Sequence, residues 1–98
     1  MKENYDREER LIEVLGSRPR LKILLTLARS SGPLTIYKIG RYSGLGRSTI
    51  NRNIGILLES GLVERVLYGE IPLYALNPGS DEVKVLVEAF RGMKLIRT

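Results

Sequence analysis

The sequence predicts a mainly α-helical fold with one small β-hairpin. Apolar residues repeat at helical spacing along most of the chain, and between residues 62 and 76 this gives way to two short runs of β-forming residues around a turn. A length of 98 residues and a hydrophobic content of 43% fit one domain with one core. We therefore divide residues 1–98 into an N-terminal helix (1–16), a core (17–78) and a C-terminal helix (79–98).

The first two helices are expected at residues 4–15 and directly after Ser17. The first is acidic and amphipathic, ends at Gly16, and has three apolar residues on one side, Leu11, Ile12 and Leu15. Ser17 can cap the second helix, and Pro19 suits its first turn, where a missing N–H costs nothing. The second helix repeats apolar residues at helical spacing, at Leu21, Leu24, Leu25 and Ala28, and a Gly-Pro pair at residues 32–33 stops it.

Two further helices follow in close succession. Thr35 is expected to cap a short helix at residues 36–42, which Gly44 closes. The next helix begins after Gly46, where a glycine cap costs only about a few tenths of a kcal/mol, and it ends near Ser60 with Gly61 in the left-handed conformation. At about 100° per residue its apolar side chains share one face, and they are Ile50, Ile54, Leu57 and Leu58.

The opposite side of this helix carries a polar edge. Ser48, Thr49 and Arg52 lie on the far side from the apolar face, and Asn51 and Asn53 flank them. Hydroxyl, amide and guanidinium groups can donate to phosphates or read base edges in the major groove. The polar edge therefore indicates binding to double-stranded DNA.

The hairpin and a last helix complete the chain. We expect strands at residues 62–67 and 73–76, joined by a loop at residues 68–72. Pro78 and Gly79 then break the chain, and Ser80 caps a helix whose positive start is favoured by Asp81 and Glu82. This last helix has an apolar stripe made of Val83, Leu86, Val87, Phe90 and Met93.

Residues 45–65, LGRSTINRNIGILLESGLVER, resemble the recognition helix and wing of winged helix-turn-helix regulators of the ArsR and MarR type. The pattern of that group runs roughly L-S-x-S-T-V-S-R-H-L-x-x-L-x-x-x-G-L-V-x-R. The matching positions here are Leu45, Ser48, Thr49, Ile50, Arg52, Ile54, Leu57, Gly61, Leu62, Val63 and Arg65. The resemblance extends from residue 15 to about residue 78 and implies a winged helix-turn-helix with extra terminal helices. It also implies a DNA-binding transcriptional regulator, most simply a repressor.

The resemblance and the polar edge together define the expected DNA contacts. These are Thr35, Tyr37, Lys38, Arg47, Ser48, Thr49, Asn51, Arg52, Asn53, Arg65 and Tyr68. Two points stay open. Tyr37 and Tyr42 could equally form the rim of the core. The wing carries Glu70 and a proline where relatives commonly place Arg or Lys, so it contacts DNA through Arg65, Tyr68 and the Gly69 backbone or hardly at all.

The charge of the chain is concentrated in the segment with this resemblance. Residues 16–60 hold eight cationic side chains and one carboxylate, a net charge of +7, whereas residues 1–15 have a net charge of −2 and the whole chain +5. A basic face of this kind is either simply solvated or attracts a polyanion. Its coincidence with the helix-turn-helix pattern favours nucleic acid.

The apolar stripe of the last helix has two interpretations. It packs on its own domain, or it pairs with a second copy of the chain together with the N-terminal helix. We favour a homodimer, with an interface formed by Leu11, Leu15, Val83, Leu86, Val87, Phe90 and Met93. A dimer would place two recognition helices about 34 Å apart and predicts a two-fold symmetric operator.

Composition excludes several other functions. The chain has no cysteine and no histidine, so we expect no metal site and no cofactor, which departs from the metal-sensing members of the group. A phosphate-binding loop and a recognisable carboxylate pair are also lacking, so we expect no enzyme. No segment is apolar enough to cross a membrane, and we expect a cytoplasmic protein.

The alternative function is a winged-helix protein-interaction module of transcription machinery or of a DNA-partition assembly.

Overall fold

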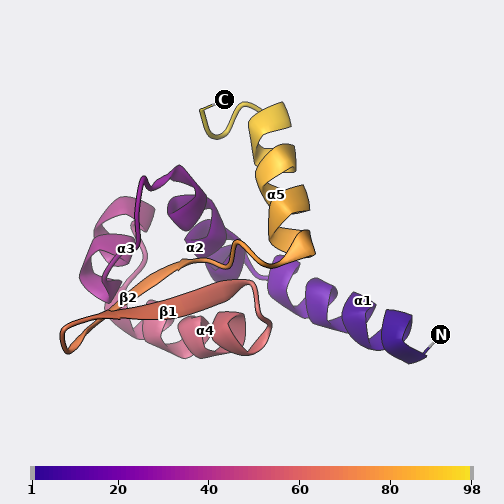
Figure 1. The fold of residues 1–98 in the computed structure, drawn as a ribbon, viewed down its shortest axis with the longest axis horizontal. Helices are drawn as coiled ribbons and strands as arrows, with labels where there is room; N and C mark the ends of the chain where they lie inside the picture. The colour runs from indigo at the N-terminus through magenta and orange to yellow at the C-terminus, as the bar shows by residue number, and fades with distance from the viewer. Residues whose placement is uncertain (1, 98) are drawn as a thin grey trace.

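A computed structural model describes the backbone of residues 2–97 and the side chains of residues 6–97. The elements follow in the order α1 (Lys2–Leu15), α2 (Arg18–Arg29), α3 (Ile36–Ser43), α4 (Arg47–Glu59), β1 (Val63–Tyr68), β2 (Ile71–Leu76) and α5 (Asp81–Gly92). Helices α2, α3 and α4 form the body, from which α1 and the tip of the hairpin project in opposite directions (Figure 1). The longest dimension is 41 Å. The mainly α-helical fold with one hairpin is confirmed.

The helix ends are set by the capping residues that the sequence predicts. Ser17 accepts a hydrogen bond from the N–H of Arg20 at 3.4 Å, and Thr35 accepts one from the N–H of Lys38 at 3.1 Å. Ser80 does the same for the N–H of Val83 at 3.2 Å. Each hydroxyl therefore satisfies one of the N–H groups that a helix start leaves without a partner.

The hairpin turn is shorter than the sequence analysis expects. The strands extend to Tyr68 and Ile71, which pair with each other, so the turn has only Gly69 and Glu70 at its centre. The expected loop at residues 68–72 is wrong because Gly69 adopts a φ of 63°. A glycine with positive φ at the first central position gives a two-residue turn that matches the twist of the flanking strands, and Pro72 is tolerated in this short ribbon.

A third segment adds to the hairpin. Leu34 and Tyr74 exchange two backbone hydrogen bonds of 2.8 Å each, which attaches the segment before α3 to the outer side of β2. Both residues are buried. The base of the hairpin is therefore fixed to the start of the helix-turn-helix, while its tip extends beyond the body (Figure 1).

The core lies where α2, α3 and α4 meet beneath the hairpin. Its largest fully buried side chains are Ile23, Leu24, Ile39, Ile50, Leu57 and Val14. Helices α3 and α4 approach closely at Gly40, where a Cβ atom would lie 3.3 Å from both the Leu45 carbonyl oxygen and the Ile50 Cδ1 atom. The absence of a side chain at Gly40 permits this close crossing.

The apolar faces of α1 and α2 differ from those expected. On α1 it is Val14 that is buried, while Ile12 and Leu15 face outward, because this helix meets the body at its C-terminal end. On α2 the buried residues are Ile23, Leu24, Thr26 and Leu27. Helix α2 packs against α1, α3, α4 and β2, so it buries a broader face than a single stripe.

No helix within residues 2–97 combines the length and apolarity needed to span a bilayer.

Candidate nucleic-acid interface

Helices α3 and α4 form a helix-turn-helix. They are joined by residues 44–46, and Gly44 has a φ of 77°, a left-handed conformation that ends α3. The Ser43 hydroxyl accepts a hydrogen bond from the N–H of Leu45 at 3.1 Å inside this turn. A short turn containing glycine is typical of this motif, in which the second helix enters the major groove.

Helix α4 has one buried face and one exposed polar face. Ile50, Ile54 and Leu57 are buried, and this anchoring fixes the rotation of the helix about its axis. The exposed polar side chains are Arg47, Ser48, Asn51 and Arg52, and Thr49 is half-buried beside them. The arrangement follows the polar edge that helical periodicity predicts.

The Arg52 guanidinium retains most of its hydrogen-bonding capacity. Within the described residues, its one hydrogen bond joins Nη2 to the Thr49 hydroxyl at 3.5 Å, which is long for such a bond. A guanidinium has five N–H donors. Arg52 can therefore reach a phosphate or a guanine edge without losing a strong bond inside the protein.

Helix α3 adds a second exposed polar surface next to the turn. Tyr37 and Tyr42 are 69% and 61% exposed, so neither forms a rim of the core. Lys38 and Arg41 are also exposed. Sequence reasoning did not include Arg41 among the contacts, although it belongs to the same run of cations. The Thr35 oxygen already caps α3, which leaves its O–H group as a donor.

Asn53 differs from the other residues of the polar edge. Its Oδ1 accepts a hydrogen bond from Arg20 Nη1 at 2.8 Å, and its Nδ2 donates to the Thr49 carbonyl at 2.7 Å. Both ends of the amide are therefore engaged inside the protein. In this geometry Asn53 links α2 to α4, so its contact with a duplex stays a prediction and depends on the second N–H of the amide.

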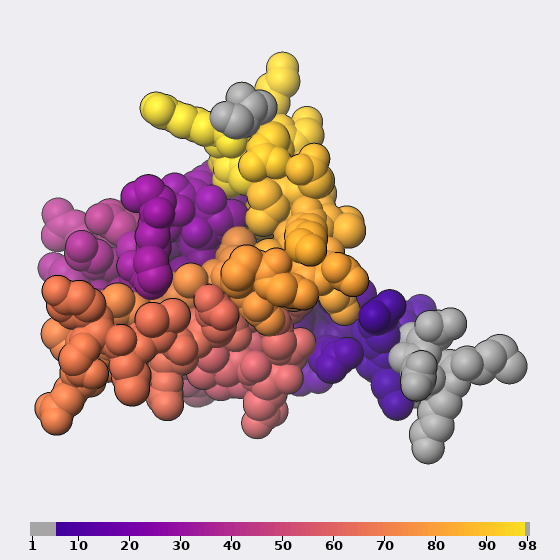
Figure 2. All heavy atoms as spheres, viewed as in Figure 1, coloured from indigo at the N-terminus to yellow at the C-terminus, as the bar shows by residue number. Residues whose placement is uncertain are grey.

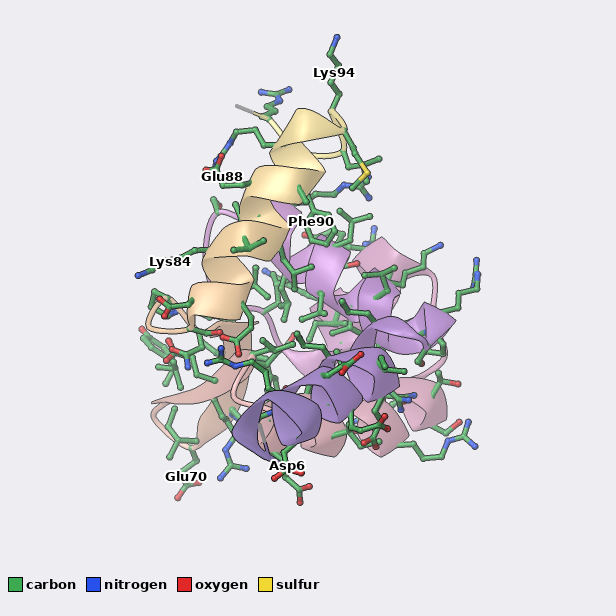
Figure 3. The ribbon with its side chains drawn as sticks, turned by 90° about the vertical axis from the view of Figure 1, so that its right-hand side faces the viewer. Asp6, Glu70, Lys84, Glu88, Phe90 and Lys94 are labelled. Atoms are coloured by element: carbon green, nitrogen blue, oxygen red, sulfur yellow. The ribbon has the colours of Figure 1, made fainter. Side chains whose placement is uncertain are left out.

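The wing combines one cation with an apolar tip. Arg65 and Tyr68 are exposed, as are Leu67 and Ile71, and Glu70 projects from the tip of the hairpin (Figure 3). A duplex lying against the wing would meet Arg65, the Tyr68 hydroxyl and backbone N–H groups. It would also meet the Glu70 carboxylate, which phosphates repel.

The residues expected at a dimer interface fall into two groups. Val83 and Phe90 are each only 4% exposed within one chain, and Phe90 lies on the side of α5 that faces α2 (Figure 3). Their inclusion in the interface was wrong, because the chain buries them itself. The Met93 side chain is exposed, and Leu11, Leu15, Leu86 and Val87 are exposed or half-buried.

An apolar groove separates α1 from α5. It has a volume of about 370 Å³ and is lined by Arg7, Leu11, Leu15, Asp81, Glu82, Val85 and Leu86. Arg7 Nε lies 3.5 Å from Glu82 Oε1, an ion pair that joins the two helices. Sequence reasoning missed Val85, which is 69% exposed because it lies off the stripe that α5 turns toward its own domain.

Comparisons with known proteins agree with this geometry. A family model described as MarR family matches residues 17–67, from the cap of α2 into β1. A sequence search among curated proteins found no match.

Solved structures of three proteins illustrate the structural similarity. HlyU from Vibrio cholerae N16961 is 24% identical, with a TM-score of 0.77 over 95% of this chain and 97% of its own. Mb0332 from Mycobacterium bovis is a homodimeric winged helix-turn-helix DNA-binding domain and possible ArsR-family regulator. It is 25% identical, with a TM-score of 0.75 over 95% and 82% of the two chains. The repressor BigR from Xylella fastidiosa is 25% identical, with a TM-score of 0.74 over 95% and 91%. The winged helix-turn-helix fold is confirmed.

Proposed function

Because this chain belongs to the MarR family, we propose that it is a transcriptional regulator that binds double-stranded DNA sequence-specifically as a homodimer, most simply a repressor. The observation that carries the proposal is the exposed polar face of α4, which is held in place by Ile50, Ile54 and Leu57 on the opposite side. Two structural neighbours support this class of function, since BigR is a transcriptional repressor and Mb0332 is a possible ArsR-family transcriptional regulator.

The proposed contacts divide by chemistry. Arg47, Arg52 and Lys38 supply charged donors for phosphates, and each arginine can also bind a guanine edge. Hydroxyl and amide groups at the start of α3 and α4 contact phosphates or bases, and these belong to Thr35, Tyr37, Ser48, Thr49 and Asn51. The wing offers Arg65 and Tyr68 to the duplex, but Glu70 at its tip opposes a phosphate contact, so the phosphate count rests on α3 and α4 alone.

Charge supports the choice of a polyanion as partner. The net charge of +7 over residues 16–60 covers α2, α3 and α4. A surface with this excess attracts DNA over long range and makes affinity depend on salt. Two copies that each use Lys38, Arg47 and Arg52 would neutralise roughly six phosphates.

The homodimer is supported by the surface of the terminal helices. The groove between α1 and α5 is largely apolar, and Ile12, Leu15, Val85 and Met93 are exposed around these helices. Apolar patches of this kind usually bind a partner. Mb0332, which has the same fold, is homodimeric. Pairing through α1 and α5 would present two α4 helices to a two-fold symmetric operator.

The experiment that tests this function measures binding of a labelled random-sequence duplex as a function of salt. We expect the slope of log affinity against log salt to lie between about −3 and −6, since each neutralised phosphate contributes about −0.9. Selection of bound genomic fragments would then identify the operator, and a reporter under that operator would distinguish repression from activation. Fragments without a common symmetric motif would argue against sequence-specific binding by a dimer.

The wing favours a second candidate function, a protein-interaction module. Leu67, Tyr68 and Ile71 are 62%, 76% and 54% exposed, with Glu70 between them. An apolar projection with an acidic tip is better suited to a protein surface than to a phosphate backbone. A salt slope near zero would favour this candidate over DNA binding.

A further inference from the structure

A pocket lies at the opposite end of α5 from the groove with α1. It has a volume of about 500 Å³ and is formed by the C-terminal ends of α2 and α5 and by residues 94–97. Arg29 Nε donates to the Leu95 carbonyl at 2.9 Å, and this bond holds the C-terminal segment against α2. Three separate segments of the chain therefore build the walls.

The turn after α5 gives the pocket its shape. The N–H of Leu95 donates to the Phe90 carbonyl at 2.8 Å, and the N–H of Lys94 donates to the Arg91 carbonyl at 3.0 Å. This pair of bonds is the Schellman motif, which needs a left-handed residue, usually glycine. Here the left-handed residue is Lys94, with a φ of 61°. The sequence thus places a cation where glycine would be less strained.

Four cationic side chains line this pocket. They are Arg29, Arg91, Lys94 and Arg97. Within residues 6–97 the only carboxylate paired with any of them is Glu88, whose Oε1 lies 2.9 Å from Arg91 Nη1. Arg29 and Arg91 also lie in the last turns of their helices, where cations are favoured. Lys94 and Arg97 lie beyond the end of α5. A favourable interaction with a helix terminus therefore does not explain why these two residues are cations.

We propose that this pocket binds a small multivalent oxyanion, carrying carboxylate or phosphate groups. Guanidinium and ammonium donors from three segments can form charge-assisted hydrogen bonds with one such ion, and the ion would offset their mutual repulsion. The proposal goes beyond DNA binding and does not depend on it.

The position of the pocket favours a small ligand over a duplex. The C-terminal segment stands at one end of the molecule, while α4 lies at the opposite side beyond α2 and the hairpin (Figures 1 and 2). A duplex on the exposed face of α4 would therefore be remote from the C-terminal cations. The pocket is also concave and of the size that small-molecule sites usually have.

The test is calorimetric titration of the full chain at low ionic strength with citrate and, separately, with pyrophosphate. We expect saturable binding of one or both, and the probe that binds more tightly identifies the favoured oxyanion group. Lys94→Gly together with Arg97→Gln should weaken binding by roughly tenfold or more, since charged hydrogen bonds are lost. Lys94→Gly alone should keep or raise the melting temperature, because glycine suits the left-handed turn, so loss of binding is separable from loss of fold.

Lys84→Gln is the matched control. Lys84 lies on the same helix, outside the pocket, where its Nζ is 3.8 Å from Asp81 Oδ1, and Figure 3 shows it on a different side of α5 from Phe90. This variant should bind the oxyanion as the wild type does. The proposal is overturned if neither probe binds, or if Lys84→Gln weakens binding as much as the double variant. It is also overturned if the double variant weakens duplex binding while oxyanion binding is unchanged, since the cations would then be a DNA contact.

Discussion

The Arg20 guanidinium on α2 binds Asn53 on α4 and also the Glu13 carbonyl on α1, so it joins three helices. Nη1 donates to Asn53 Oδ1 at 2.8 Å, while Nε and Nη2 donate to the Glu13 carbonyl at 3.2 and 2.9 Å. Arg20 lies on α2, Asn53 on α4, and Glu13 near the end of α1. A single side chain thus connects the helix proposed to contact DNA with a helix proposed to contact the second copy.

Arg20 and Asn53 should be energetically coupled. We expect Arg20→Ala and Asn53→Ala each to destabilise the fold, and the double variant to lose less than the sum, with a coupling energy of about 1 kcal/mol. Urea unfolding of the four proteins measures this. Strict additivity would mean that the hydrogen bond between Arg20 and Asn53 contributes nothing to the stability of the fold.

Duplex binding in the same set of variants separates positioning from direct contact. If Asn53 acts through Arg20, both single variants should weaken binding by a similar factor, because both release α4 from α2. If Asn53 reads a base, Asn53→Ala should lose much more affinity than Arg20→Ala, by about 1 to 3 kcal/mol. The second result would confirm Asn53 as a DNA contact.

Arg52→Ala should weaken duplex binding by about 1 to 3 kcal/mol without changing the unfolding curve. Its side chain is exposed, and among residues 6–97 it makes one long hydrogen bond, to Thr49, so truncation removes a DNA contact and little else. Lys84→Ala is the control, because it removes an exposed cation from α5. Equal loss of affinity in the two variants would show that total charge, and not the face of α4, governs binding.

Sequence reasoning predicted most of the fold because local signals determine it. Capping hydroxyls at Ser17, Thr35 and Ser80 fixed three helix starts, and the apolar periodicity of α4 identified its buried face. The hairpin was misjudged, since the φ of Gly69 and not residue composition sets the turn length. The pairing of Leu34 with Tyr74 is too distant in sequence to leave a local signal.

The candidate site was predictable where periodicity alone determines exposure. The positions of Arg47, Ser48 and Arg52 follow from rotation about the α4 axis. Asn53 could not be assigned in this way, because its partner Arg20 lies on another helix. The burial of Phe90 likewise depends on how α5 packs against the body, which an apolar stripe by itself does not specify.

Gly55→Ala should stabilise the fold by up to about 1 kcal/mol, the usual difference between glycine and alanine inside a helix. Gly55 lies within α4, and beyond the neighbouring residues and backbone of its own helix a Cβ atom there would meet no described atom within 4 Å. Gly44→Ala is the contrasting variant, because Gly44 has a φ of 77° that alanine adopts only with strain. It should be destabilising. Thermal unfolding measures both, and a loss of stability in Gly55→Ala would show that α4 needs the freedom of glycine at this position.

Val85→Glu should dissociate the proposed dimer while leaving the fold of each chain intact. Val85 is 69% exposed and lines the groove between α1 and α5, so the new carboxylate is solvated in the monomer and would be buried without a partner in the dimer. Phe90→Glu is unsuitable, since Phe90 is buried in its own chain.

Leu67→Glu supplies the control for this prediction, because it adds the same charge at a 62% exposed residue on the wing. Sedimentation at tens of micromolar, with far-ultraviolet circular dichroism on the same samples, should show folded monomers for Val85→Glu and dimers for Leu67→Glu and the wild type. A wild type that is already monomeric would exclude this interface. Dissociation of both variants would instead place the contact on the wing.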